Sequence, residues 1–201
     1  FCSSPFSKYE VDLLLKLDVP FLKIASMDVN NLELLKHSAK TGLPIILSTG
    51  MSTLAEIENA IRVIEAQGNN KIAILHCIAI YPPEFKDINI NNIPMLLQTF
   101  GYPVGFSDHS IGTSIPLAAI TLGSCIIEKH FTIDKDLPGW DHEISANPEE
   151  MKVIVNESKN IVTSLGSYKR IVSKAEEEKK IKFRRSIVSS NNLSKGHVIT
   201  L

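Results

Sequence analysis

Two short segments of this sequence, GFSDH and EKHFT, carry histidines in positions suited to binding a metal ion. Each segment ends or continues a short apolar run. Because alternate side chains of a strand point to the same side, Ser107 shares a side with His109, and Glu128 shares one with His130. A single histidine in such a place is more often a hydrogen-bonded rim residue. Two on consecutive strands favour a site for a divalent cation, with manganese and magnesium among the candidates if oxygen ligands complete it.

A lysine and several serines form a second group. Lys23 lies within the otherwise apolar run FLKIAS, where a lysine is rarely buried without a partner. It is either a rim lysine that reaches solvent or a clamp for a phosphate or carboxylate. The turn at Gly50 could add backbone N–H groups. Hydroxyl donors could come from four serines that lie at the ends of apolar runs: Ser4, Ser26, Ser48 and Ser107.

The segment PGWDHEIS, from Pro138 to Ser145, is a turn-rich loop after the last apolar run. Asp141 and His142 would lie near the same rim as the two histidines. Spacing alone favours a turn-stabilising aspartate with a surface histidine. Trp140 would pack on a sugar face or seal the loop.

The elements that must position these residues alternate along the chain. Six short apolar runs end in polar or small residues, and they are typical of buried parallel strands: FCSSPF, FLKIAS, PIILSTG, IAILHCI, PVGFSDH and CIIEKHFT. Stretches with helical spacing separate them. We expect helices over Tyr9–Leu17, Asn31–Lys40, a stretch capped by Ser52, Ile93–Phe100, Ile111–Leu122 and a stretch opened by Pro148.

Repeated βα units predict a parallel sheet with helical crossovers. A doubly wound sheet could use six strands, whereas a closed (β/α)₈ barrel needs eight. The polar residues at the ends of all six runs favour an incomplete barrel of about six βα units. We expect this TIM-barrel domain over residues 1–165, a charged linker over 166–184, and the start of a small β domain over 185–201.

Composition excludes several classes of protein. The chain has 201 residues, of which 44% are hydrophobic and 21% are charged, as in ordinary globular proteins. The net charge of −1 argues against broad surfaces for nucleic acid or anionic membranes. The chain has only three cysteines, a small and odd number, which argues against the disulfide framework of a secreted protein. With no signal peptide visible, we expect a cytoplasmic protein.

Taken in order, KIAS, ILSTGM, LHC, GFSDHS, EKHFT and PGWDHEIS resemble the sialic acid synthase family, whose members make N-acetylneuraminate and related sugars such as legionaminate. The resemblance covers nearly the whole chain. The tail, FRRSIV followed by LSKGHVI, resembles the opening of that family's C-terminal antifreeze-like (SAF) domain. The resemblance therefore implies a (β/α)₈ barrel joined to a small SAF domain, in domain-swapped homodimers.

The same resemblance implies a reaction and its residues. Phosphoenolpyruvate attacks the aldehyde of an N-acetylated amino sugar through C3, C2 takes up water, and phosphate leaves by C–O cleavage. His109 and His130 are expected to bind Mn²⁺ or Mg²⁺, with Glu128 as a catalytic residue beside them. The residues expected to hold phosphoenolpyruvate are Ser4, Lys23, Ser26, Ser48 and Ser107. Those expected to face the amino sugar are Asp28, Tyr81 and Asp141.

Two departures from the family pattern bear on this expectation. Ile78 and Ala79 follow LHC, where the family often has polar residues such as Thr and Asn. The chain also lacks counterparts of the family's first barrel units and of most of the SAF domain. We therefore expect a fragment of a longer protein, inactive by itself. Another metal-dependent aldol-type enzyme and a non-catalytic barrel remnant remain the alternatives.

Overall fold

The computed structural model of the protein describes residues 1–139 and 141–200. The chain divides into two compact units, Phe1–Leu165 and Gly166–Leu201. The first unit contains all strands found in the described residues and all the candidate metal, phosphoenolpyruvate and sugar residues named above.

One parallel sheet runs through the first unit. Within the described residues it has five strands in the order β1-β2-β3-β4-β5, so that each strand pairs with the next along the chain. The strands are β1 (Leu22–Ile24), β2 (Ile45–Ser48), β3 (Ile72–Cys77), β4 (Val104–Asp108) and β5 (Ile127–Lys129). Strand order that follows chain order is the arrangement of a (β/α)₈ barrel, here as a half-barrel, and the expected parallel α/β fold is confirmed.

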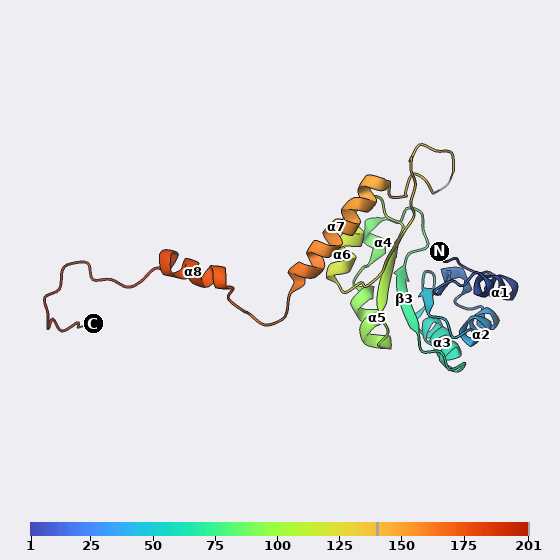
Figure 1. The fold of residues 1–201 in the computed structure, drawn as a ribbon, viewed down its shortest axis with the longest axis horizontal. Coiled ribbons are helices and arrows are strands. Elements are labelled where there is room, and N and C mark those ends of the chain that lie inside the picture. Colours follow the sequence, from blue (N-terminus) through green and yellow to red (C-terminus); the bar gives the residue numbers. More distant parts are fainter. Residues whose placement is uncertain (140, 201) are drawn as a thin grey trace. The chain divides into compact units, whose positions relative to one another are not determined.

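Helices connect successive strands, as Figure 1 shows along the colour gradient. In chain order, the helices of the described residues are α1 (Lys8–Lys16), the 3-10 helix η1 (Ser26–Asp28), α2 (Leu32–Lys40), α3 (Leu54–Glu65), α4 (Phe85–Ile88), α5 (Asn92–Phe100), α6 (Ser114–Thr121), α7 (Pro148–Leu165) and α8 (Lys174–Phe183). Of these, α1 precedes β1, α7 follows β5, and α8 belongs to the second unit. Among the described residues, no helix combines the length and the apolar character needed to cross a membrane.

The expectation of six strands is wrong by one, because the run FCSSPF forms no strand. Residues 1–6 are irregular. A strand exists only through ladder hydrogen bonds to a neighbour, and Pro5 cannot donate one. The run therefore has the composition of a strand without the pairing, and Ser4 reaches the site from an irregular segment.

Alternate strand residues separate the two faces of the sheet. Ile24, Leu47, Ile74 and Phe106 are buried in a core shared with α2, α3, α5 and α6. The intervening positions, such as Lys23, point to the opposite, concave face. Because the side-chain period of a strand is two, the same strands supply both the helix-facing core and the residues of the site.

Most helix bounds follow the predicted spacing, with two differences. The cap of α3 is Thr53 instead of Ser52: its side chain accepts from the N–H of Glu56, whose carboxylate accepts from the N–H of Thr53 at 2.7 Å. A capping box needs a separation of three residues, which Thr53 has and Ser52 lacks. Helix α6 begins at Ser114 rather than Ile111, because the residues just after His109 form bends.

In the second unit, α8 occupies part of the predicted linker. Ser173 and Glu176 form its capping box, and no residue of the helix is buried. Residues 184–200 contain neither helix nor strand, apart from a turn near Gly196. The expected start of a small β domain stays a prediction.

Candidate active site

The two motif histidines lie together at the carboxyl ends of neighbouring strands. His109 follows β4 and His130 follows β5, and their ring centroids are 5.3 Å apart. Nδ1 of His109 lies 2.8 Å from the carbonyl oxygen of Ile78. Since a carbonyl only accepts, Nδ1 carries the proton and Nε2 keeps its lone pair. Burial also lowers the pKa of His109, which favours the neutral imidazole that binds metals.

Tyr81 and Asp141 surround this histidine pair. The Tyr81 ring packs on His109 with centroids 4.0 Å apart and meets His130 edge-on at 5.7 Å. A carboxylate oxygen of Asp141 lies 3.6 Å from Nδ1 of His130. Burial raises the pKa of Tyr81, so its hydroxyl stays protonated at neutral pH and can donate a hydrogen bond.

Lys23, Glu128 and Ser107 form a charged cluster on the concave face. The same carboxylate oxygen of Glu128 lies 3.3 Å from Nζ of Lys23 and accepts from the hydroxyl of Ser107 at 2.7 Å. Ser107 and Glu128 are partners in the β4–β5 register. Only 12% of the Lys23 side chain is exposed. Lys23 therefore pairs with Glu128 inside the site. The alternative of a rim lysine would require its ammonium group to extend into solvent.

The other predicted serines lie on the first two βα units. Ser26 begins η1, and its hydroxyl accepts the N–H of Gly50 at 3.0 Å, so the Gly50 amide is used within the protein. Ser48 ends β2, and within the described residues its buried hydroxyl has no hydrogen-bond partner. A buried unpaired hydroxyl is costly, and a ligand oxygen at this point would satisfy it.

Two adjoining cavities contain most of these residues. Their volumes are about 370 Å³ and 230 Å³. Both are lined by Lys23, Ser107, His109, Glu128 and His130. The larger is lined also by Ser26, Ser48, Cys77, Ala79 and Tyr81, and the smaller also by Ser4, Asp108 and Lys129. Each is large enough for a small phosphorylated acid.

Asp28 is the predicted site residue that the structure keeps apart. It lines neither cavity. One of its oxygens accepts from the side-chain amide of Asn31 at 3.0 Å, and the other is buried and unpaired among the described residues. Asp28 thus braces the start of α2 in this arrangement.

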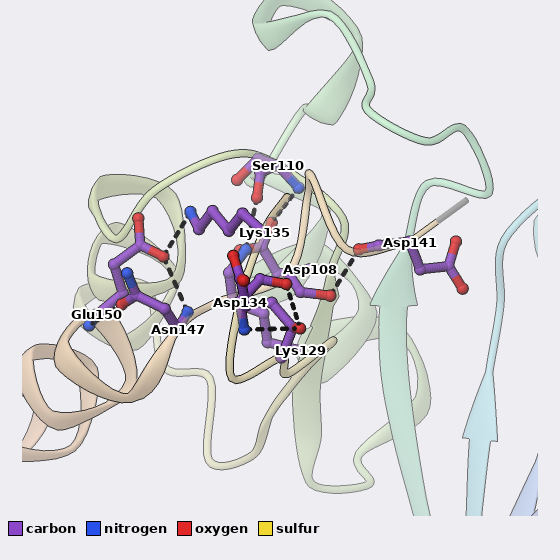
Figure 2. Close-up of polar contacts among 10 residues, drawn as sticks. Asp108, Ser110, Lys129, Asp134, Lys135, Asp141, Asn147 and Glu150 are labelled. Carbon is purple, nitrogen blue, oxygen red and sulfur yellow. Dashed lines mark hydrogen bonds and ion pairs between the residues drawn. The ribbon is translucent and has the colours of Figure 1, made fainter. Parts of the chain in front are cut away.

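The segment PGWDHEIS belongs to a loop that polar contacts close on itself. The hydroxyl of Thr132 lies 2.8 Å from Nδ1 of His142, and Lys135 forms an ion pair of 2.7 Å with Glu150 at the start of α7. Ser145 donates to the carbonyl of Asp141 at 2.6 Å. Figure 2 shows the contact between Lys135 and Glu150. His142 therefore helps to hold the loop, whereas the prediction for Trp140 falls outside the described residues.

Sequence reasoning missed a buried ion pair between the residues that precede the histidines. Nζ of Lys129 lies 2.7 Å from a carboxylate oxygen of Asp108, and the two side chains are 1% and 0% exposed. A signal was present, since opposite charges occur one residue before each histidine on adjacent strands.

The donor set fits a divalent cation held partly by the protein. The described residues contain no cluster of three or more His, Cys, Asp or Glu side chains suited to a metal. The protein thus offers two imidazoles, and oxygen atoms of water and substrate would complete the shell. Mixed nitrogen and oxygen ligands suit Mn²⁺, and oxygen-rich shells suit Mg²⁺.

The two departures from the family pattern affect the site differently. Ile78 contributes its backbone carbonyl to His109, and any residue type could do the same. Ala79 lines the larger cavity with its side chain, so the loss of a polar group there changes what a ligand meets.

Comparison with known proteins shows which family and which relatives this chain is similar to. Residues 1–170 match the NeuB family. The chain is 44% identical over 201 residues to an uncharacterized protein of Methanocaldococcus jannaschii, covering all of this chain and 60% of that protein. It is 40% identical over 202 residues to an N,N'-diacetyllegionaminic acid synthase of Campylobacter jejuni, again with 100% and 60% coverage.

A solved structure supports the same assignment as the family match and the two relatives. A crystal structure of the N-acetylneuraminic acid (sialic acid) synthetase of Leptospira borgpetersenii, in complex with citrate, superposes with a TM-score of 0.82 at 38% identity. The match covers 91% of this chain and 65% of that one. The chain thus spans about 60% of the length of the curated relatives it matches. By its sequence and its half-barrel fold, the chain belongs to the NeuB family, the group of sialic acid synthases that its motifs predicted.

Proposed function

We propose that the protein carrying this chain condenses phosphoenolpyruvate with an N-acetylated amino sugar, N-acetylmannosamine or a related hexose. The products would be a nine-carbon sialic-acid-type sugar and inorganic phosphate. The observation that carries the proposal is the convergence of a lysine, several hydroxyls and two imidazoles on one pair of cavities. Relatives named as legionaminic and sialic acid synthases support the same class of reaction.

The anion end of the substrate is the best supported part. A lysine ammonium and serine hydroxyls are suitable partners for phosphate and carboxylate oxygens. Lys23 lies on β1 and Ser48 on β2, Ser26 begins η1 just after β1, and Ser107 lies on β4. Groups fixed on strands and on the short helix that follows β1 can hold an anion without reorganising, and much of the rate enhancement in such sites comes from that preorganisation.

The histidine end would receive the sugar aldehyde. A divalent cation, Mn²⁺ or Mg²⁺, supplies Lewis-acid polarisation of that carbonyl when bound. His109 and His130 would hold it through ring nitrogens, with the His109 tautomer set by Ile78. Tyr81 and Asp141 border the histidines and would contact the polar groups of the sugar.

Glu128 stands between the two ends and is suited to moving a proton. C3 of phosphoenolpyruvate would form a bond to the aldehyde carbon, and C2 would become electron-poor. Water then adds to C2 and loses a proton, for which the Glu128 carboxylate is a nearby acceptor. Breaking the C–O bond to phosphate completes the sequence, with Lys23 beside the departing anion.

Whole-protein properties belong to the proposal as well. We extend it to a homodimer, as the family resemblance implies.

The test is to incubate the protein at its natural length with phosphoenolpyruvate, Mn²⁺ and a panel of N-acetylated hexoses, and to measure phosphate release. Metal-dependent release with at least one hexose, and not with phosphoenolpyruvate alone, is the expected result. Release that is absent with every sugar, or unaffected by a chelator, would count against it.

A further inference from the structure

Asp108 and Lys129 form a closed polar unit at the ends of β4 and β5. They are partners in the strand register. One oxygen of Asp108 lies 2.7 Å from Nζ of Lys129, and the other accepts the N–H of Ser110 at 2.8 Å. Nζ of Lys129 also donates to the carbonyl of Ser110. Figure 2 shows the three residues together. Every charged atom of the pair therefore has a specific partner.

Stability alone is a poor explanation for this pair. Removing two charges from water costs several kcal/mol per ion, which their mutual attraction often does no more than offset. Apolar side chains of similar volume at such positions are often equally stable or more so. The backbone ladder already joins β4 to β5 here. The directional contacts of an ion pair offer something that apolar packing lacks, which is a fixed orientation of the groups around it.

The groups around the pair are the two motif histidines. Asp108 and Ser110 flank His109, so the contact between them holds the backbone on both sides of that residue. Lys129 precedes His130, whose carbonyl oxygen accepts the N–H of Ala146 at 2.8 Å. The ion pair is thus a direct connection between the backbone segments that carry the two imidazoles.

We propose that the Asp108–Lys129 pair is a positioning element that sets the spacing of His109 and His130 for a shared divalent cation. The inference rests on the proposed function, because it assumes that these two histidines bind the metal. Both residues border the smaller cavity, but their side chains are buried against each other, 1% and 0% exposed, so they are not offered to the cation or the substrate as ligands. They act through the backbone of the histidines, whose ring centroids they hold 5.3 Å apart.

The experiment separates positioning from folding by replacing both charges at once. In the double variant Asp108→Leu/Lys129→Met, apolar groups fill the buried space and leave no unpaired ion. We expect the double variant to fold, as judged by circular dichroism and thermal melting. Its Mn²⁺ affinity, titrated without substrate by electron paramagnetic resonance or calorimetry, should fall about 10- to 100-fold, as is typical when groups that orient metal ligands are removed. The single variant Lys129→Met should melt earlier than the double variant, because it leaves a buried aspartate unpaired.

A matched control uses an ion pair remote from the site. Lys8 and Glu33 lie 3.1 Å apart on exposed helix surfaces. The variant Lys8→Met/Glu33→Gln should bind Mn²⁺ like the wild type. A folded Asp108→Leu/Lys129→Met protein with unchanged affinity would overturn the inference. So would a double variant that fails to fold, because the pair would then serve the fold itself. Wild-type protein that binds no Mn²⁺ would instead refute the metal site of the proposed function, and the inference with it.

Discussion

The carboxylate of Glu128 lies 3.3 Å from the ammonium group of Lys23, inside the cavity proposed for an anionic substrate. The Glu128 carboxylate is therefore an anion of the protein itself that already contacts Lys23. A phosphate or carboxylate group that enters must share Lys23 with Glu128 or displace it. Ser107 contacts the same carboxylate oxygen and would be released in the same event.

This arrangement predicts different effects of Glu128→Gln on binding and on turnover. The neutral amide no longer competes for Lys23, so the KM for phosphoenolpyruvate should not rise. Loss of the proton acceptor should lower kcat about 100-fold, within the usual range for general acid–base groups. Steady-state phosphate release measures both. Glu58→Gln, which removes an exposed partner of Arg62 on α3, is the control and should change neither value. A raised KM with normal kcat would show that Glu128 serves binding alone.

The two motif histidines should be equally necessary. We expect His109→Ala and His130→Ala each to abolish Mn²⁺-dependent phosphate release, since one imidazole alone leaves the cation with a single protein ligand. His37→Ala is the matched control, because His37 pairs with Asp12 at 2.7 Å on the outer helices. Undiminished release in both motif variants would refute the metal assignment.

The glycine of GFSDH has a steric role that leads to a prediction about stability. A Cβ at Gly105 would lie 2.5 Å from Cδ2 of Leu75 and 2.7 Å from the carbonyl oxygen of Ile126. The backbone atom of that contact cannot move away as a flexible side chain could. Gly105→Ala should therefore lower the free energy of unfolding by roughly 3 kcal/mol.

Gly42→Ala provides the comparison for that measurement. Gly42 has a φ of +72° and open space where a Cβ would lie, so alanine meets backbone strain without a clash. The cost should be about 1 kcal/mol. Urea denaturation of both variants checks the order. Equal losses would mean that the β4 packing relaxes around the added methyl group.

Local sequence patterns predicted much of the fold. The alternation of side chains along a strand placed Ser107 with His109 and Glu128 with His130, because strand parity is a property of the backbone itself. Apolar spacing located the helices within a few residues. The same kind of reasoning wrongly predicted a strand at FCSSPF, because strand pairing depends on a neighbouring strand that composition does not reveal.

Contacts between distant residues were the part that the sequence could not supply. Nothing local indicates that Lys23 pairs with Glu128 or that the carbonyl of Ile78 orients His109. Asp108 was overlooked because a strand-end aspartate is usually read as a cap or a solvent-facing group. Its burial against Lys129 follows only from the register of β4 and β5.

A last prediction concerns a histidine outside the two cavities that His109 and His130 line. His76 on β3 is buried, stacks on Phe106, and contacts the carbonyl oxygen of Ile88 through Nε2 at 2.7 Å. Burial lowers the pKa of His76, and the hydrogen bond to Ile88 only partly opposes that shift. The unfolded chain, in which the pKa of histidine is about 6.5, therefore binds a proton more readily than the folded chain.

The sign of the pH effect follows from that difference. Because the unfolded state takes up more protons below pH ~6.5, the free energy of unfolding should fall as the pH drops from that value, by at most about 1.4 kcal/mol per pH unit from this residue. His109, whose pKa is also lowered by burial, contributes in the same direction. Urea titrations at pH 7.5, 6.5 and 5.5 on the wild type and on His76→Gln isolate the His76 share. The variant should lose less stability between pH 6.5 and 5.5, whereas identical pH slopes in the two proteins would show that His76 titrates alike in the folded and unfolded states.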